Sequence, residues 1–231
     1  MTTSFIGAAS AEATSISSMP THQKGDLIAI WALRAANSLP TIPATWFAAG
    51  SRTSTGIGGL LAWKIAASSS ETSGTWTNAA ALLAVVYRHT TNLILPGGVS
   101  LANTATSTTI NYSLMLGNSS TGIAGVMRAA SSVVACGVWA LTNTATIETV
   151  PTFTSITPVG STFTLRNNAV LTTYEAAWFD TNATVTGMNT GSATASGSVT
   201  TITFTMEIND TGVAKSSGGF RAVNIRGGAD Q

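Results

Sequence analysis

The chain has 231 residues, a length that one large β domain can fill. Only 8% of the residues are charged and 44% are hydrophobic, which excludes a disordered chain that avoids collapse. Basic residues are scattered singly and the net charge is +1, so the concentrated basic patch that a nucleic-acid interface needs is missing. The sequence therefore argues against a nucleic-acid partner.

The composition favours strands over helices. Thr and Ser are abundant, whereas Glu, Lys and Gln are scarce. Thr is β-branched and suits a pleated surface, so an all-β domain is expected. With so few charges, hydroxyl and amide groups must make the outer faces polar. Such neutral surfaces repel one another weakly and tolerate dense neighbours, which hints at assembly.

Short apolar runs separated by Gly, Pro, Asn, Ser and Thr recur along the first half of the chain. Residues 4–9 and 14–18 are the first such segments, and a strong strand begins at Leu27. Residues on both faces of this strand are apolar, which is typical of a central strand covered on both sides. The segment LPTIPATW, with Pro40 and Pro43, predicts an extended connection.

Two further strands are predicted at LLAWKIA and within GTWTNAAALLAVVYR. A helix is conceivable over residues 78–86, because Ala and Leu propagate helices well. The neighbouring aromatic and β-branched residues Trp76, Val85, Val86 and Tyr87 favour a strand instead. Residues 93–118 are interpreted as a loop and an edge strand with a turn at Pro96.

The second half of the sequence echoes the first. SSVVACGVWALTN resembles GDLIAIWALRAAN, VLTTYEAAWFD takes the place of LLAWKIA, and GSVTTITFTMEIN takes the place of GTWTNAAALLAVVYR. This pattern predicts a pseudo-repeat of strand order, as two interleaved Greek keys would give. The predicted fold is an antiparallel β-sandwich of jelly-roll or Greek-key topology.

The last strand has the clearest period of two. Residues Ile202, Phe204, Met206 and Ile208 alternate with Thr201, Thr203, Thr205 and Glu207, so one face is core and the other is solvated or contacts a neighbour. We expect a sandwich domain over residues 1–209 and a Gly/Ser-rich tail over 210–231. Apolar residues in this tail predict docking on its own domain or on another subunit: Phe220, Val223 and Ile225.

No catalytic or metal-binding pattern is found. His22 and His89 lie beside turn-like segments and are interpreted as surface or loop residues, while the lone Cys136 is expected to be a buried, inert thiol. The carboxylates are isolated and are expected to face solvent. Glu175 and Asp180 have an odd separation, which puts them on opposite faces of one strand. The sequence therefore predicts no enzyme, no cofactor and no metal.

The six tryptophans suggest a carbohydrate-stacking platform as an alternative function. Most of them lie inside apolar strand runs, where a core role is favoured. Trp46 and Trp76 lie next to turns and are expected to reach a surface. They are the candidates for glycan stacking.

The first residues, MTTSFIGAAS, lack the basic and apolar regions of a signal peptide, so no secretory export is expected. No stretch is apolar for long enough to span a bilayer, so no membrane insertion is expected.

The order of motifs resembles a jelly-roll-like β-sandwich domain found in structural proteins of tailed bacteriophages. The residues that carry the resemblance are Gly25, Asp26, Pro43, Trp46, Trp63, Thr75, Trp76 and Thr77, with a strand entry at residues 191–198. The resemblance spans residues 5–208, and the segment 93–118 and the long tail depart from it. It implies a virion protein that assembles in the host cytoplasm, and it leaves open whether the position is on the capsid, the neck, the tail or a fibre.

Two functions follow as expectations. The first is a non-enzymatic virion structural protein, such as a capsid decoration protein, which assembles in multiple copies with itself and with other virion proteins. The alternative is a carbohydrate-binding module that binds a host surface glycan during adsorption, through Trp46 and Trp76.

Overall fold

A computed structural model gives the fold. It describes residues 3–113, 133–142, 144, 147, 149–153, 156–157, 161–181, 185, 187–188 and 190–214. All regular structure within these residues is β-strand. Most of the segment 78–86, for which a helix is conceivable, belongs to strand β5 (Ala81–Arg88). The prediction of a strand at this place is confirmed.

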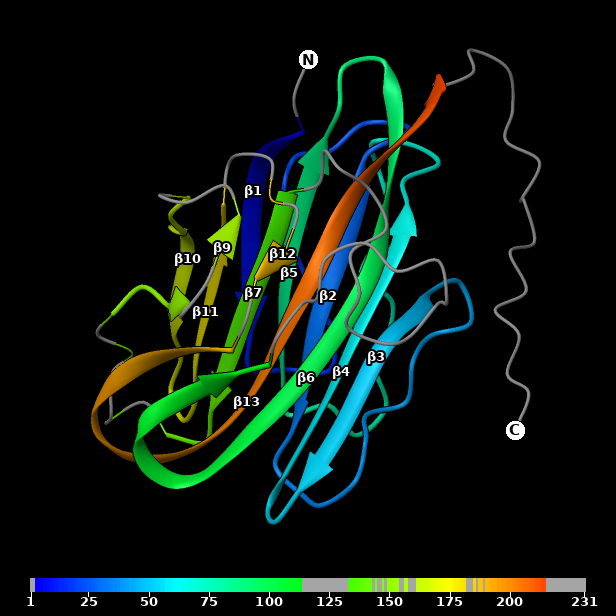
Figure 1. The fold of residues 1–231 in the computed structure, drawn as a ribbon. Coiled ribbons are helices and arrows are strands. Elements are labelled where there is room, and N and C mark those ends of the chain that lie inside the picture. The colour runs from blue at the N-terminus through cyan, green and yellow to red at the C-terminus, as the bar shows by residue number, and fades with distance from the viewer. Residues whose placement is uncertain are drawn as a thin grey trace, which may run out of the picture.

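The first sheet is built from the N-terminal part of the chain (Figure 1). Its strand order is β1 (Ser4–Ala11), β5, β2 (Leu27–Arg34), β4 (Ile57–Ile65) and β3 (Phe47–Ser54). Each strand is antiparallel to its neighbours. Strands β1 and β3 are therefore the two edges of this sheet.

The second sheet has the order β10 (Thr164–Val170), β11 (Glu175–Asp180), β7 (Val133–Ala140), β13 (Gly191–Ala214) and β6 (Asn92–Tyr112). The short strand β8 (Thr152–Phe153) also pairs with β13, and β9 (Ile156–Thr157) pairs with β12 (Gly187–Met188). The segment predicted as loop and edge strand is thus largely the long edge strand β6. Strand β13 continues to Ala214, past the expected domain boundary at residue 209.

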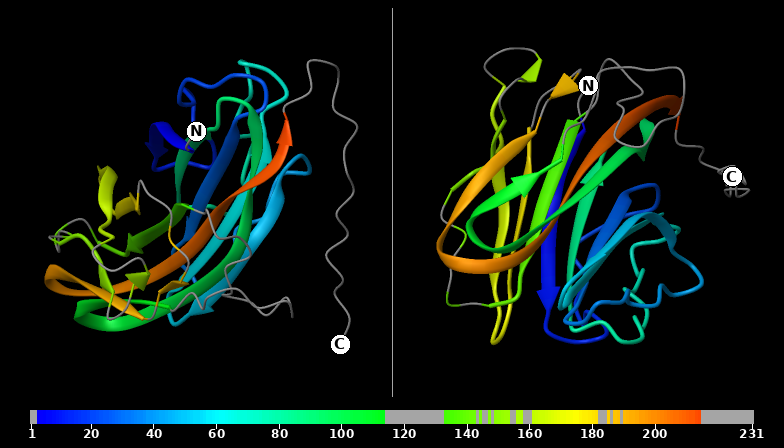
Figure 2. Two further views of the ribbon diagram at one scale, coloured as in Figure 1. Left: turned by 45° about the horizontal axis from the view of Figure 1, so that its top comes forward. Right: turned by 60° about the horizontal axis from the view of Figure 1, so that its bottom comes forward.

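The two sheets pack face to face, which confirms the predicted all-β antiparallel sandwich (Figure 2). Large aromatic side chains fill the space between the sheets. Trp31 and Trp178 both contact the ring of Phe204, at centroid distances of 5.2 and 4.6 Å. Trp139 Nε1 donates a 3.0 Å hydrogen bond to the Trp31 carbonyl oxygen, which joins the central strands of the two sheets.

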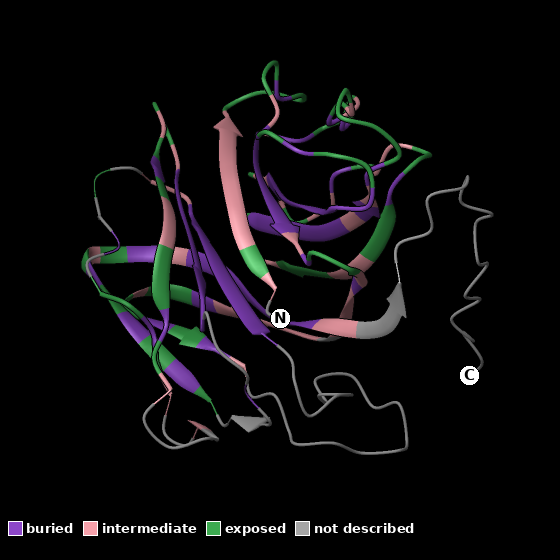
Figure 3. Ribbon diagram, turned by 90° about the horizontal axis from the view of Figure 1, so that it is seen from above, coloured by how far each residue is buried: buried purple, intermediate pink, exposed green. Residues whose placement is uncertain are grey.

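The outer face of the first sheet is also buried. Ile28, Ile30 and Val86 on this face pack with Trp46 and Trp76 from the connections between strands. Figure 3 shows buried residues along the inner strands and partly exposed residues along edge strand β1. The prediction that the strand beginning at Leu27 is covered on both sides is confirmed.

The outer face of the second sheet is covered by the same chain. Thr203 Oγ1 donates to the Asn111 carbonyl oxygen at 2.7 Å, and Thr205 Oγ1 donates to the Ser113 carbonyl oxygen at 3.2 Å. Thr201, Thr203, Thr205 and Glu207 are all fully buried. The expectation that this face of the last strand is solvated or contacts a neighbour is therefore wrong, because the end of β6 folds back across it.

The predicted repeat of strand order is confirmed. When the five long strands of each half are numbered along the chain, both sheets have the order 1-5-2-4-3. The register also repeats: Trp31 lies opposite Leu61, two residues before Trp63, and Trp139 lies opposite Ala176, two residues before Trp178. The halves are not interleaved, however, because each large sheet is formed by one half and the chain passes between them once, from β5 to β6.

Candidate functional site

Trp46 and Trp76, the candidates for glycan stacking, lie under the outer cover of the first sheet. Their exposed fractions are 5% and 0%, and their rings meet edge to face at a centroid distance of 5.7 Å. Trp76 Nε1 donates to the Ser73 carbonyl oxygen at 2.9 Å. The expectation that they reach a surface is wrong. Both side chains, although next to turns, pack into the apolar cluster that covers the outer face of the first sheet. Neither ring offers a face to a sugar.

A polar cluster lies beside Trp46. Lys64 Nζ is 2.6 Å from Glu71 Oε2 and 4.8 Å from the Trp46 ring centroid. His22 contacts the Pro20 carbonyl oxygen through Nδ1 at 2.6 Å and accepts from the Glu71 backbone N–H through Nε2 at 3.0 Å. Burial opposes ionisation of Glu71, but the hydrogen bonds and charge of Lys64 outweigh it and lower the pKa of this carboxyl. The cluster fastens the cover to strand β4.

A second polar network lies between the sheets. The Tyr87 hydroxyl donates to Asp180 Oδ2 at 2.9 Å and accepts from Trp178 Nε1 at 2.8 Å. Arg166 Nε donates to both Asp180 oxygens at 2.9 Å. Burial first, and then the Asp180 charge, raise the pKa of Tyr87 well above its ordinary value, which keeps the phenol protonated. The network joins β5 to β10 and β11; Tyr87 and Asp180 lie inside the core, and Arg166 reaches them from the β1/β10 edge.

The Gly25-Asp26 pair forms the turn into strand β2. Gly25 has φ = +87°, a left-handed conformation that glycine adopts without steric cost. Asp26 accepts from the Gln23 backbone N–H at 2.9 Å and forms a bidentate ion pair with Arg88, with Arg88 Nη2 at 2.6 Å from Oδ2. These residues hold the ends of β2 and β5 together.

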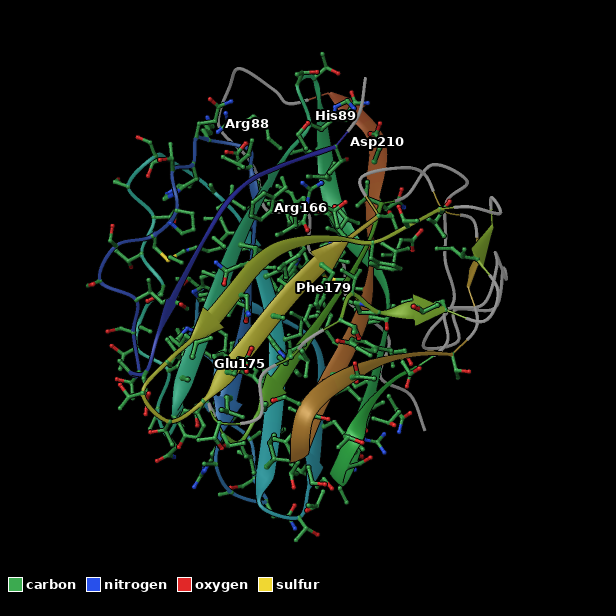
Figure 4. The ribbon with its side chains drawn as sticks, turned by 90° about the vertical axis from the view of Figure 1, so that its left-hand side faces the viewer. Arg88, His89, Arg166, Glu175, Phe179 and Asp210 are labelled. Carbon is green, nitrogen blue, oxygen red and sulfur yellow. The ribbon has the colours of Figure 1, made fainter. Side chains whose placement is uncertain are left out.

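The two histidines lie in loops, as expected, but they are buried, with exposed fractions of 6% for His22 and 2% for His89, so the expectation of a surface position is wrong. His89 Nδ1 accepts from the Asn92 backbone N–H at 2.9 Å, and Nε2 lies 3.4 Å from Asp210 Oδ2. Figure 4 shows His89 and Asp210 together at one end of the molecule. This contact ties the turn between β5 and β6 to strand β13.

Four acidic side chains also differ from expectation. Asp26, Glu175, Asp180 and Glu207 are 0 to 1% exposed, so the prediction that the carboxylates face solvent is wrong for these four. The opposite orientation of Glu175 and Asp180 is confirmed. Asp180 points between the sheets, whereas Glu175 Oε1 accepts from the Ile147 backbone N–H at 3.1 Å on the outer side. Burial raises the pKa of Glu175, and its Oε2 has no hydrogen-bond partner within the described residues.

Few features of a reaction centre appear in the described part of the chain. No three His, Cys, Asp or Glu side chains of these residues gather into a group that could hold a metal ion. Cys136 is buried as predicted, and burial raises the pKa of its thiol well above the ordinary value. None of the described segments forms a helix that could cross a membrane.

Two shallow hollows lie near the start of β13: the first borders strand β8, and the second lies between the end of β6 and the first residues of β13. The first has a volume of about 330 Å³ and the second about 380 Å³. Phe153 and Phe163 line the first, and Tyr112 lines the second. The described residues that line the two hollows carry no charge. These residues therefore include no carboxylate, imidazole, amine or thiol that could act as an acid, a base or a nucleophile.

The exposed large apolar side chains mark a different kind of site. Among the described residues they are Phe47 (58% exposed), Val170 (55%), Leu165 (46%) and Val150 (42%). Phe47 lies on β3 and Leu165 and Val170 lie on β10, so three of the four lie on strands at the edge of a sheet. Because β3 lies next to β6 and β1 next to β10, the sandwich has two open sides, the β3/β6 edge and the β1/β10 edge (Figure 1).

Polar contacts hold each open side together. At the β3/β6 edge, Arg52 Nε donates to Asn103 Oδ1 at 2.6 Å, and Asn103 Nδ2 donates to Ser54 Oγ at 2.9 Å. At the β1/β10 edge, the Arg166 guanidinium lies 5.5 Å from the Phe5 ring centroid. These contacts link the two sheets at each edge.

Sequence reasoning did not identify these edge residues. Phe47 directly follows Trp46, and one of two adjacent aromatic residues had to point away from the other, but the sequence alone does not show which is exposed. The predicted docking residues Phe220, Val223 and Ile225 lie outside the described residues. Docking of the tail therefore stays a prediction.

The chain matches no protein-family model, no curated protein and no solved structure. The fold and its surfaces alone define the class: an antiparallel β-sandwich with two covered outer faces and two open edges.

Proposed function

We propose that this protein is a non-enzymatic structural protein of a bacteriophage virion, which assembles in multiple copies through protein–protein contacts. The observation that carries the proposal is how few of the described residues are both charged and exposed. Of the charged side chains within the described residues, only Glu12, Lys24 and Arg52 are exposed. A surface of this kind repels its neighbours weakly and suits dense packing.

The use of the remaining ionisable groups supports a structural role. The buried carboxylate Asp180 is bound by Tyr87 and Arg166, and Lys64 is paired with Glu71. These groups hold strands and covers together. A catalytic acid or base must reach a substrate, which their burial opposes.

The assignment to a tailed bacteriophage rests on the resemblance of the sequence motifs. The residues of this resemblance act as turn and core residues: Gly25 opens β2, Trp46 and Trp76 fill the cover, and Trp63 packs against the core. They support a shared sandwich fold and leave the position within the particle, on capsid, neck or tail, open. The alternative of a glycan-binding module loses its basis, because Trp46 and Trp76 are buried.

The proposal is tested on purified particles. Virions banded on a density gradient and washed in high salt are digested, and the chain is quantified by mass spectrometry against the major capsid protein. We expect many copies per particle that stay bound through the wash. Recovery of the chain only in the soluble fraction of the lysate contradicts the proposal.

A further inference from the structure

We propose that copies of this chain associate head to tail, with the β3/β6 edge of one copy docked on the β1/β10 edge of the next. This inference rests on the proposed multi-copy role and names its interface. Both edges carry exposed apolar residues: Phe47 on one, and Leu165 and Val170 on the other.

The pairing of strands places one positive and one negative side chain at the same level on opposite edges of the sheet. Along the first sheet, Arg52 lies opposite Gly59, Gly59 opposite Leu33, and Leu33 opposite Ala81. On the far side Ala11 lies opposite Leu82, so Glu12 continues the row of Ala81. Arg52 and Glu12 therefore occupy the same row on opposite edges of the sheet. A second copy displaced along this row brings one Arg52 beside the next copy's Glu12.

The same pairing places an exposed aromatic residue and small residues on one row, at opposite edges of the sheet. Phe47 lies opposite Trp63, Trp63 opposite Ala29, Ala29 opposite Val85, and Val85 opposite Ala8. The row thus begins with an exposed aromatic side chain on β3 and ends in the small residues of β1, whose sequence is SFIGAASA. Small residues let a large side chain from a neighbour approach the strand closely. Phe47 of one copy is covered in this way by β1 of the next.

Both charged residues are held in position. Arg52 donates through Nε to Asn103 and through Nη1 to the Leu101 carbonyl oxygen, which leaves further guanidinium N–H groups to donate. Glu12 Oε2 accepts from the Thr173 backbone N–H at 2.9 Å. Hydrogen bonds from the Thr173 side chain and backbone outweigh the effect of desolvation and lower the pKa of Glu12, so this exposed carboxyl is ionised at neutral pH.

The edge strands favour contact through side chains over a continuous backbone ladder. Each carries a bulge, between Phe5 and Gly7 in β1 and between Ala48 and Gly50 in β3. Bulges interrupt the ladder that a neighbouring strand would extend. Specific partners such as Arg52 and Glu12 can then set the register.

The charges also favour a head-to-tail arrangement over a two-fold one. A two-fold dimer through one edge brings together two surfaces that both carry Arg52 or both carry Glu12, and like charges oppose association. Opposite edges bring unlike charges together. A head-to-tail contact leaves one free edge at each end, so it extends into a ring or a filament.

Charge-reversal variants test this geometry. Arg52→Glu and Glu12→Arg each place like charges across the contact, and each should raise the dissociation constant for self-association at least about tenfold. An equimolar mixture of the two variants restores one unlike pair at every contact, and the double variant does the same within one chain. Sedimentation velocity in low salt should show mainly monomer for each single variant and restored assembly for the mixture and the double variant.

Matched variants control for net charge and for folding. Lys24→Glu makes the same change in net charge as Arg52→Glu at an exposed site on neither edge strand, and should leave assembly unchanged. Phe47→Ser should weaken assembly, whereas Val150→Ser, at an exposed apolar residue on neither edge strand, should not. Circular dichroism confirms that each variant is folded.

The outcomes separate the interface from the proposed function. Assembly that is unaffected by either single variant, or that the mixture and the double variant fail to restore, overturns the head-to-tail interface. If the chain is nevertheless abundant in purified particles, the proposed function stands without this contact. If the interface is confirmed but the chain is absent from particles, the virion role fails and self-association remains.

Discussion

The two halves of the molecule have the same strand order but different covers. In the first half, the connections between strands carry Trp46 and Trp76 onto the outer face of the sheet, and the cover is mainly apolar. In the second half, an apolar cluster around Phe163 and Phe179 is joined by the end of β6, which crosses the outer face of β13 and accepts hydrogen bonds from Thr203 and Thr205 through its backbone. The shared register shows that the sandwich needs the order and spacing of its strands. The covers are free to differ in chemistry.

The central tryptophans show the same contrast. Trp139 Nε1 donates to the Trp31 carbonyl oxygen, whereas Trp31 Nε1 has no partner within the described residues. Equivalent positions in the two halves therefore agree in packing and differ in hydrogen bonding. Substitutions at equivalent positions of the two halves can show whether packing or hydrogen bonding contributes more to the free energy of unfolding.

The largest effect is expected from removing the aromatic residues of the covers. Trp76→Ala empties a fully buried site and should lower the free energy of unfolding by about 3–5 kcal/mol. Phe163→Ala in the cover of the second sheet should fall in the same range of about 3–5 kcal/mol. Urea denaturation followed by tryptophan fluorescence measures both. A large loss in only one variant would show that one cover is dispensable.

The next largest difference is expected between a buried hydroxyl group that has hydrogen-bond partners and one that has none within the described residues. Tyr87→Phe leaves Trp178 Nε1 and one contact of Asp180 unpaired in the core, which should cost about 1–3 kcal/mol. Thr201→Val removes a buried hydroxyl that has no partner within the described residues, and should be neutral or stabilise by up to about 1 kcal/mol. Denaturant midpoints of the two variants should therefore move in different directions or by clearly different amounts.

A smaller, pH-dependent effect separates Glu175 from Glu71. Burial raises the folded pKa of Glu175, so its ionisation destabilises the fold as pH rises above the unfolded value of 4.5. Glu175→Gln should thus be more favourable at pH 7 than at pH 4. The folded pKa of Glu71 is lowered, so Glu71 stabilises the fold above pH 4.5, and this contribution is lost as pH falls through the folded pKa.

Glu71→Gln should therefore cost more stability at pH 7 than at low pH, the opposite trend to Glu175→Gln. Urea titrations of both variants and of the wild type at pH 4 and pH 7 give the comparison. Parallel trends in the two variants would contradict the assigned environments of these carboxyl groups.

The smallest effect on stability is expected at the open edges. Phe47→Ser changes a side chain that is 58% exposed, so the free energy of unfolding should change by less than about 0.5 kcal/mol. The same variant is expected to weaken assembly, so stability and association should separate at this residue. A large loss of stability would instead place Phe47 in the core.

Much of the fold could be predicted from the sequence. The apolar residues on both faces from Leu27 to Leu33 indicate a covered central strand, and the Trp-containing segments around Trp31 and Trp139 indicate the repeat. Alternation shows which residues share a face of a strand. It does not show what covers that face, and for this reason the buried hydroxyl groups of Thr203 and Thr205 were unexpected.

The candidate site was less predictable, because exposure at an edge depends on long-range pairing. Arg52 and Glu12 are 40 positions apart in the sequence, and only the pairing of five strands places them on one row. The burial of His22, His89 and Asp180 likewise depends on partners that are distant in the chain. Local patterns carry no information about such partners.

The segregation of the halves has a consequence for synthesis. All strands of the first sheet precede residue 89, so this sheet can pair completely before the second half has left the ribosome. Until then, the inner face with Trp31, Leu61 and Val85 has no partner. The nascent chain thus passes through a stage in which a large hydrophobic surface is exposed to other proteins. Binding by a chaperone, or rapid translation and folding of the second half, protects it from aggregation.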